Sequence, residues 1–265
     1  MQPLTVIKVG TGVLTRATNG TLDGGSLVRL VTAIADLTEK GHRCLLVSSG
    51  AVGAGVSAFG LKNYPEDVIT RQACAAVGQA KLMHTYENLF QQFDIAVAQV
   101  LLTAGDFQTP KRRGYLSNTM DRLLIEPNVI PIINENDSVA IRELRFGDND
   151  MLSARVAKLL GATSLILLTS VDGLLNPENN ELVPVVEDVD TVLGFAKDER
   201  GRFSIGGMAS KLKAVKNAVD AGITTYIAHG REPERLAGIL AGEPDLATRF
   251  VAKVPATEPP ETTEG

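Results

Sequence analysis

Several residue types that mark large classes of protein are scarce in this sequence. Tryptophan is absent, aromatic residues make up 5% of the chain, and only 2 cysteines occur, Cys44 and Cys74. The core must therefore consist of aliphatic side chains, and we expect both cysteines to be reduced and buried in a cytoplasmic protein. Acidic residues (31) outnumber basic ones (26), which argues against non-specific nucleic-acid binding because that needs a basic face.

Long apolar segments are missing as well. No run approaches the roughly 20 apolar residues of a membrane span, and the N-terminus lacks the basic and apolar regions of a secretory signal. Hydrophobic residues still make up 44% of the 265 residues, which is enough for a large core. We find no internal repeat and no dividing linker, so we expect one domain over residues 1–253. Residues 254–265 are rich in Pro, Thr and Glu and are expected to form a disordered tail.

Strand-like apolar runs alternate along the chain with segments of helical periodicity. The strands are expected at residues 4–9, 43–47, 95–102, 129–133, 164–168 and 223–228. The helices are expected within 48–60, at 26–40, 66–93 (one long or two short), 113–125, 150–160, 208–221 and 232–240. Apolar strands that alternate with helices indicate an α/β fold, with a parallel sheet covered on both faces. The alternating segment 139–146 predicts a small hairpin that stands off this sheet.

Glycine is the residue type in excess. The chain has 25 glycines among its 265 residues, a share above the average of about 7%. They gather where predicted strands end or helices begin, at residues 10–12, at Gly50, Gly53 and Gly55, and at 206–207. Ligands of open α/β sheets bind beyond the carboxyl ends of the strands, glycine lets backbone N–H groups approach them, and helix N-termini favour anions. We interpret these loops as phosphate- and substrate-facing backbone; the alternative at each is a tight turn.

Two familiar nucleotide motifs do not fit. The P-loop needs Gly-Lys followed by Ser or Thr, and this tripeptide is absent. The dinucleotide fingerprint needs a third glycine, and the segment 10–15 (GTGVLT) has Thr15 in that place. The P-loop and dehydrogenase classes are therefore disfavoured.

Lysines occupy two unusual positions. Lys8 lies inside the first predicted strand, where a buried charge is costly unless it is paired, and beside a glycine loop its natural partner is a phosphate. The alternative is an edge position from which the ammonium reaches water. Lys211 lies one turn into the helix after Gly207, where a cation opposes the helix dipole unless an anion binds there too. The alternative is an ordinary surface lysine.

Polar clusters follow the fourth strand and precede the next helix. The segment 134–137 (NEND) is well placed to bind a polar substrate, although a solvated turn is the alternative. The segment 147–150 (GDND) contains three Asp or Asn residues just before a predicted helix. One of them is accounted for as the helix cap, and a cap does not need the other two. These groups could bind a substrate amine or orient the lysines.

Two lysines, an acidic cluster and three glycine loops at one sheet edge indicate phosphoryl transfer. That reaction needs positioning and charge stabilisation, commonly with Mg²⁺. The 3 histidines, His42, His84 and His229, are far apart in sequence and suggest no metal motif. We therefore predict a kinase without a P-loop, whose acceptor the residues alone do not name.

These same residues resemble the amino acid kinase family. The matching stretches are VIKVGTGVLT (6–15), LLVSSGAVGAG (45–55), VIPIINENDSVA (129–140), FGDNDMLSA (146–154), LILLTSVDGL (165–174) and GGMASKLKA (206–214). They span nearly the whole chain, and the NENDSVA and GDNDMLSA blocks together resemble the subfamily that phosphorylates L-glutamate. The resemblance implies a three-layer α/β/α sandwich around a mainly parallel sheet. It also implies transfer of the ATP γ-phosphate to the γ-carboxylate of L-glutamate, the first step of proline synthesis.

The resemblance also implies roles for individual residues. Lys8 and Lys211 would stabilise charge on the transferring phosphoryl group, and Asp150 would organise the two lysines. Glutamate would be held by Ser49, Asn134, Asp137, Asp148 and Asn149. ATP would be contacted by Lys8, Gly10, Thr169, Ser170, Ile205, Gly206, Gly207, Met208, Ala209, Ser210 and Lys211. Mg²⁺ is implied beside ATP with no metal-binding residue assigned, proline is implied as a feedback inhibitor, and the assembly is expected to be a homo-oligomer.

The sequence departs from the family pattern at two points, and two other functions compete. It ends without the C-terminal PUA domain that many members carry, and Ser170 stands where an Asp commonly follows the Thr. One competing function is another amino acid kinase, acting on acetylglutamate, aspartate or a small phosphate acceptor, and the NENDSVA block argues against it. The other is a non-catalytic amino-acid sensor on the same fold. The presence of Lys8, Asp150 and Lys211 argues against that function.

Overall fold

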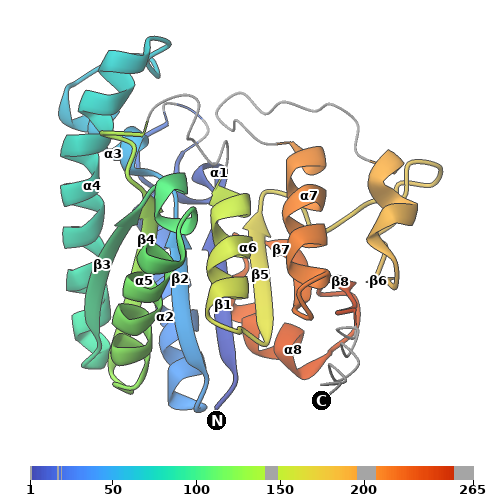
Figure 1. Ribbon diagram of the computed structural model, residues 1–265. Coiled ribbons are helices and arrows are strands. Elements are labelled where there is room, and N and C mark those ends of the chain that lie inside the picture. The colour runs from blue at the N-terminus through green and yellow to red at the C-terminus, as the bar shows by residue number, and fades with distance from the viewer. Residues whose placement is uncertain (1, 17, 19, 141–148, 196–206, 254–265) are drawn as a thin grey trace.

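The computed structural model describes residues 2–16, 18, 20–140, 149–195 and 207–253. Its centre is an 8-stranded sheet with the order β3-β4-β2-β1-β5-β7-β8-β6. Every neighbouring pair is parallel except β7 and β8. The strands are β1 (Leu4–Val9), β2 (Arg43–Ser48), β3 (Ala96–Leu102), β4 (Val129–Glu135), β5 (Ser164–Thr169), β6 (Val185–Val186), β7 (Thr224–His229) and β8 (Ala247–Phe250). The predicted mainly parallel α/β sheet is confirmed (Figure 1).

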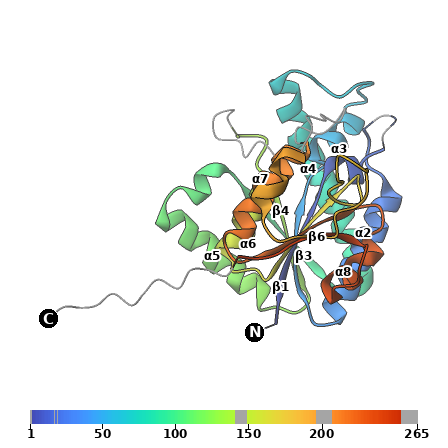
Figure 2. The ribbon, with the colours of Figure 1, turned by 90° about the vertical axis from the view of Figure 1, so that its right-hand side faces the viewer.

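Helices cover both faces of the sheet. They are α1 (Thr11–Leu14), α2 (Gly24–Glu39), α3 (Ala51–Ala58), α4 (Val68–Phe90), α5 (Pro110–Leu124), α6 (Asn149–Leu159), α7 (Met208–Val219) and α8 (Leu236–Ala241). Short 3₁₀ segments lie at Gln91–Phe93, Ala104–Phe107, Val189–Phe195 and Pro233–Arg235. Figure 2 shows α5, α6 and α7 on one side of the sheet and α2 and α8 on the other, which gives the expected three layers.

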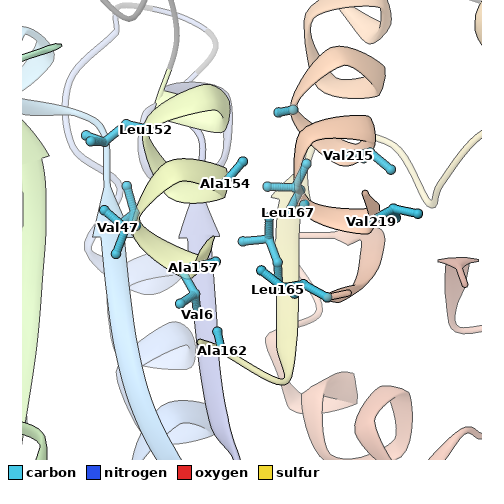
Figure 3. Close-up of a cluster of buried hydrophobic side chains, with 14 of the residues drawn as sticks. Val6, Val47, Leu152, Ala154, Ala157, Ala162, Leu165, Leu167, Val215 and Val219 are labelled. Atoms are coloured by element: carbon cyan, nitrogen blue, oxygen red, sulfur yellow. The ribbon is translucent and has the colours of Figure 1, made fainter. Parts of the chain in front are cut away.

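Two aliphatic cores result, one on each face. Alternate residues of a strand point to opposite faces, so Val6 packs beneath α6 and α7, whereas Ile7 packs against α2 and α4. Figure 3 shows the first core, which includes Leu165 and Leu167 of β5 and Val215 and Val219 of α7. Both cores are mainly aliphatic, with Phe250 in the first and Tyr86 and Phe90 in the second, and they hold the helices against the strands whose ends carry the site.

Helix starts are set by side-chain caps that the periodicity did not reveal. The Asp23 side chain accepts a hydrogen bond from Gly25 N, so α2 begins two residues before the predicted Ser26. The Asp67 side chain accepts one from Thr70 N, and this hydrogen bond lowers the pKa of that carboxyl. The predicted helix 66–93 is a single helix, α4, followed by a 3₁₀ turn. Thr109 caps α5, which begins three residues before the predicted Arg113.

Several sequence predictions need correction. The short strands β6 and β8 were missed, and the predicted helix 232–240 is a 3₁₀ turn followed by the shorter helix α8. The fourth strand does not end at Ile133, because β4 continues through Asn134 and Glu135, both buried. Only residues 139 and 140 of the predicted hairpin (139–146) belong to the described residues. The predicted tail at 254–265 lies outside them.

Candidate active site

Most of the described site candidates meet at the carboxyl edge of the sheet. This edge is at the top of Figure 1, where α1 follows β1 and α3 follows β2. Lys8 comes from β1, Ser49 follows β2, and Asn134 lies near the end of β4. Helix α6 begins here with Asn149 and Asp150. The fold thus brings together side chains that are far apart in sequence, from Lys8 in β1 to Lys211 in α7.

A buried carboxylate joins the two lysines. Lys8 Nζ lies 2.5 Å from Asp150 Oδ1, and Lys211 Nζ lies 2.9 Å from Asp150 Oδ2. The exposed fractions of the side chains are 3% for Lys8, 0% for Asp150 and 11% for Lys211. Each carboxylate oxygen therefore holds one ammonium group, and Asp150 keeps the two cations together at the start of α6.

The charges of this cluster do not cancel. Among the described residues, the two lysines and the one aspartate of this cluster carry a net charge of plus one where water is largely excluded, and Coulomb interactions are stronger there than in bulk water. β1 lies between β2 and β5 in the middle of the sheet, so the alternative of an edge lysine that reaches water is wrong. One partner of Lys8 in the structure is the Asp150 carboxylate, and the net positive charge of the three described side chains suits an additional anion.

A second polar network begins at the neighbouring residue, Asn149. Its Nδ2 atom donates hydrogen bonds to Ser49 Oγ at 2.9 Å and to Asn134 Oδ1 at 2.9 Å. It also lies 3.3 Å from the carbonyl oxygen of Ser48. Asn149 therefore ties the start of α6 to the loop after β2 and to the end of β4.

Asn134 is held in turn by two further contacts. Its Oδ1 accepts the backbone N–H of Glu135 at 2.8 Å, and its Nδ2 donates to Gln79 Oε1 at 2.9 Å. Gln79 lies on α4 and is 8% exposed. Sequence reasoning missed Gln79 because nothing in its local pattern distinguishes it from a solvent-facing residue of a long helix.

Tyr86, also on α4, supports the loop after β2 and was missed for the same reason. Its hydroxyl lies 2.8 Å from Ser48 Oγ, and Ser48 Oγ donates to the carbonyl oxygen of Ser49 at 3.0 Å. Because the serine proton is used there, Tyr86 is the donor. Burial raises the pKa of the Tyr86 phenol, which keeps this donor proton in place.

The glycines at this edge fall into two groups. A Cβ atom at Gly55 would overlap the carbonyl oxygen of Cys74, and one at Gly78 would overlap that of Ala51. A Cβ at Gly53 would lie 2.6 Å from the carbonyl oxygen of Gly20. Gly53 and Gly55 therefore permit close packing of α3 on α4 and on the loop before α2, a packing reason for glycine that the sequence prediction of a ligand-facing backbone did not include.

Other glycines stay compatible with a ligand-facing role. A Cβ atom at Gly12 would meet no heavy atom within 4 Å, and one at Gly10 would lie 3.4 Å from Lys8 Nζ. Gly50 has a φ of 102°, in the left-handed region that favours glycine, at the N-cap of α3. Gly207 is the N-cap residue of α7, the helix that carries Lys211.

The remaining predicted residues that the structure describes lie at the end of β5, in the first turn of α7 and in the turn after β4. Thr169 is buried at the end of β5, and Ser170 follows it and is exposed. Met208, Ala209 and Ser210 form the first turn of α7, so they lie beside Lys211. Asp137 is partly buried in the turn after β4. Three candidates, Asp148, Ile205 and Gly206, lie outside the described residues.

Neither a metal cage nor a membrane span appears in the described part of the chain. No group of three or more His, Cys, Asp or Glu side chains there could hold a metal ion. No helix among these residues is long and apolar enough to cross a membrane.

Comparison with known proteins identifies the class that this fold and this buried lysine pair define. The model of the amino acid kinase family matches residues 3–229. The chain therefore belongs to the amino acid kinase family, a family of phosphotransferases.

Curated relatives narrow this class further. The chain is 42% identical over 254 residues to a glutamate 5-kinase of Clostridium acetobutylicum, with 94% of each chain covered. It is 45% identical over 251 residues to a glutamate 5-kinase of Symbiobacterium thermophilum, which covers 92% of this chain and 94% of the relative. A glutamate 5-kinase of Rippkaea orientalis is 44% identical over 257 residues, covering 94% of this chain and 69% of the relative.

Solved structures agree on the fold. A carbamate kinase from Giardia lamblia bound to AMP-PNP superposes with a TM-score of 0.65 at 16% identity, covering 94% of this chain and 98% of that one. A UMP kinase from Bacillus anthracis gives a TM-score of 0.62 at 14% identity, covering 95% and 97%. The predicted amino acid kinase-like sandwich is thereby confirmed.

Proposed function

We propose that this chain is a glutamate 5-kinase, which transfers the γ-phosphoryl group of ATP to the γ-carboxylate of L-glutamate. The observation that carries the proposal is the buried pairing of Lys8 and Lys211 on Asp150, with Asn149 and its polar contacts directly beside it. Family membership and relatives at 42–45% identity support the same reaction. The product would be the acyl phosphate that begins proline synthesis.

The reaction needs no nucleophile from the protein. A γ-carboxylate oxygen of glutamate attacks the γ-phosphorus of ATP, the bond from phosphorus to the bridging oxygen of ADP breaks, and that oxygen keeps the electron pair. Negative charge is then spread over the transferring group and the leaving oxygen. Lys8 and Lys211 would neutralise that charge, and Asp150 would keep both ammonium groups in place before the reaction begins, so little reorganisation is needed.

The neutral network would bind the acceptor. Ser49 and Asn149 are already joined by a hydrogen bond, and Asn134 orients Asn149. Amides and a hydroxyl offer donors and acceptors to the glutamate without adding a second negative charge beside its carboxylates. We assign the substrate ammonium to Asp137 and Asp148, because a carboxylate is its natural partner. The ATP would lie against Gly10, Thr169, Ser170 and the segment 205–211.

Mg²⁺ is proposed to arrive with ATP rather than to reside in the protein. Both Asp150 oxygens are occupied by lysines, and the described residues offer no cluster of metal ligands. The ion would neutralise phosphate charge when bound to the nucleotide. The protein itself would therefore act on the phosphoryl group through its lysines.

Three further properties belong to the proposal. The enzyme would act in the cytoplasm, where its free thiols Cys44 and Cys74 stay reduced. It would form a homo-oligomer, and proline would inhibit it as the end product. The domain is proposed to extend over residues 1–253, with 254–265 as its tail.

An acceptor panel tests this function. Purified protein is incubated with ATP, Mg²⁺ and either L-glutamate, N-acetyl-L-glutamate, L-aspartate or carbamate, and hydroxylamine traps any acyl phosphate of the amino acids as a hydroxamate while ADP is measured in parallel. We expect L-glutamate to give both hydroxamate and ADP at a rate far above the others. ADP formation with another acceptor and none with L-glutamate would reject the proposed substrate. Binding of an amino acid with no ADP formation would favour the sensor.

A further inference from the structure

Gln79 stands behind the acceptor side of the site, on a helix that the reaction itself does not use. It belongs to the buried face of α4 together with Leu82 and Tyr86, at spacings of three and seven residues. Its Oε1 atom accepts a hydrogen bond from Asn134 Nδ2 at 2.9 Å. Since Asn134 in turn accepts from Asn149, an unbroken chain of amides runs from α4 to the start of α6.

The direction of every bond in this chain is fixed by one backbone group. The N–H of Glu135 can only donate, and it points at Asn134 Oδ1 at 2.8 Å. The nitrogen of the Asn134 amide must therefore face Gln79, and the nitrogen of Asn149 must face Asn134. An amide flip at any one position would place two donors or two acceptors against each other.

The amide oxygen and the amide nitrogen of Gln79 differ in their contacts, and only the oxygen is hydrogen-bonded to Asn134. The Nε2 atom is buried and has no hydrogen-bond partner among the described residues. Buried polar groups are almost always paired, so an amide kept only for packing would be expected to use both ends or to be replaced by an apolar side chain. The contact that explains an amide here is the one that Oε1 makes with Asn134.

We propose that Gln79 is a positioning residue of the acceptor site, which acts through Asn134 to hold Asn149 in its binding orientation. This inference rests on the proposed function, because it assigns the acceptor to Asn149 and Ser49. Without the Gln79 oxygen, Asn134 Nδ2 would lose its buried acceptor, and Asn134 could rotate away from Asn149. The free enzyme would then hold Asn149 in several orientations, and binding the acceptor would have to select one of them.

The test replaces Gln79 by an apolar side chain of similar length and separates KM from kcat. We expect Gln79→Met to raise the KM for L-glutamate about tenfold, which corresponds to the loss of one hydrogen bond at a binding group. The KM for ATP should change less than about twofold. The matched variant is Leu82→Ala, on the same buried face of α4 with no polar contact. It should lower the melting temperature at least as much, because it leaves a cavity, yet leave both KM values unchanged.

A double-mutant cycle tests whether the effect passes through Asn134. If it does, Gln79→Met will raise the KM for L-glutamate of an Asn134→Ala variant by less than about twofold, because the hydrogen bond between Gln79 and Asn134 is already absent there. An unchanged KM for L-glutamate in Gln79→Met, a parallel rise in the KM for ATP, or independent effects in the cycle would each overturn the inference.

Failure of the proposed function has a different signature. If wild-type protein forms no hydroxamate with L-glutamate, the substrate is wrong, and the KM comparison is made with the acceptor that the panel identifies. If wild-type protein uses L-glutamate and Gln79→Met has the wild-type KM, the positioning role alone is wrong.

Discussion

Two polar networks begin at adjacent residues of α6 and reach toward opposite faces of the sheet. The network of Asp150 is charged and reaches Lys8 and Lys211 beside α6 and α7. The network of Asn149 is neutral and reaches the side of α4 through Asn134 and the loop after β2. One peptide unit at a helix start thus separates a region suited to stabilising charge from a region suited to binding a polar acceptor.

This difference predicts different kinetic consequences. If the proposed function holds, the lysine cluster stabilises charge that develops only in the transition state, so substitutions there should lower kcat. The proposed hydrogen bonds from the neutral network to the acceptor would be made both before and during the reaction, so substitutions in that network should mainly raise the KM for the acceptor.

The largest effect is expected at Asp150. Asp150→Asn keeps the shape but removes the charge that holds two ammonium groups together, so the lysines repel each other and separate. We expect kcat to fall about 10³-fold, in the range seen when charge stabilisation of a transition state is lost. Steady-state kinetics at saturating ATP and L-glutamate measure this, with circular dichroism to check the fold. A kcat within tenfold of the wild-type value would break the assignment of the charged network.

The lysines should follow closely. Lys8→Ala or Lys211→Ala is expected to lower kcat about 10²–10³-fold, because each removes one positive charge from the reacting group. Since both act through the same carboxylate, combining either with Asp150→Asn should cost far less than the product of the single effects. Independent, fully multiplicative losses would mean that the three residues do not act as a unit.

The framework behind the neutral network can be tested through its glycines. Gly55→Ala would drive a methyl group into the backbone of Cys74, so we expect the free energy of unfolding to fall by about 3 kcal/mol. Gly12→Ala is the matched variant, because nothing lies within 4 Å of its Cβ position, and it should change stability by less than about 1 kcal/mol. Urea denaturation compares them, and equal losses would contradict the close packing of α3 on α4.

Asn149 is expected to affect binding more than turnover. Asn149→Ala removes the donor to Ser49 and Asn134 together with the amide offered to the acceptor. We expect the KM for L-glutamate to rise about 10- to 30-fold, with kcat lowered less than about fivefold. Initial rates over a range of L-glutamate concentrations provide both values. A dominant loss of kcat would erase the distinction between the two networks.

The smallest effect is expected at Tyr86. Tyr86→Phe removes one buried hydrogen bond to Ser48, while Ser48 keeps its contact with the carbonyl oxygen of Ser49. The free energy of unfolding should fall by about 1 kcal/mol, and the KM for L-glutamate should change less than about threefold. Thermal unfolding and kinetics together check this. A tenfold rise in KM would show that the loop after β2 depends on Tyr86 as much as on Asn149.

Much of the fold could be predicted from the chain because its strands are uniformly apolar. The strands β1, β2, β3, β5 and β7 were placed to within one residue at each end. The last two residues of β4 were not, since Asn134 and Glu135 read as a loop, and their burial depends on partners such as Gln79 that are distant in sequence. The short β6 and β8 carry too few residues to form a pattern.

The site residues likewise divide into those that the local sequence singles out and those that only the packing of the fold places at the site. Lys8 and Lys211 could be singled out because a charge in a strand or at a helix start is locally unfavourable. The packing role of Gly53 and Gly55 could not be predicted, because in sequence a glycine that lets a helix approach looks the same as one that lets a phosphate approach. Gln79 and Tyr86 carry no local signal, since only the packing of α4 places them behind the acceptor network.

The measurement that tests the central distinction most directly is a side-by-side determination of kcat and of the KM for L-glutamate in Asp150→Asn and Asn149→Ala. We predict that Asp150→Asn lowers kcat about 10³-fold with little change in the KM for L-glutamate. Asn149→Ala should instead raise that KM about 10- to 30-fold and lower kcat less than about fivefold. If the two neighbouring variants lose kcat and gain KM in the same proportion, the charged and neutral networks are not functionally separate.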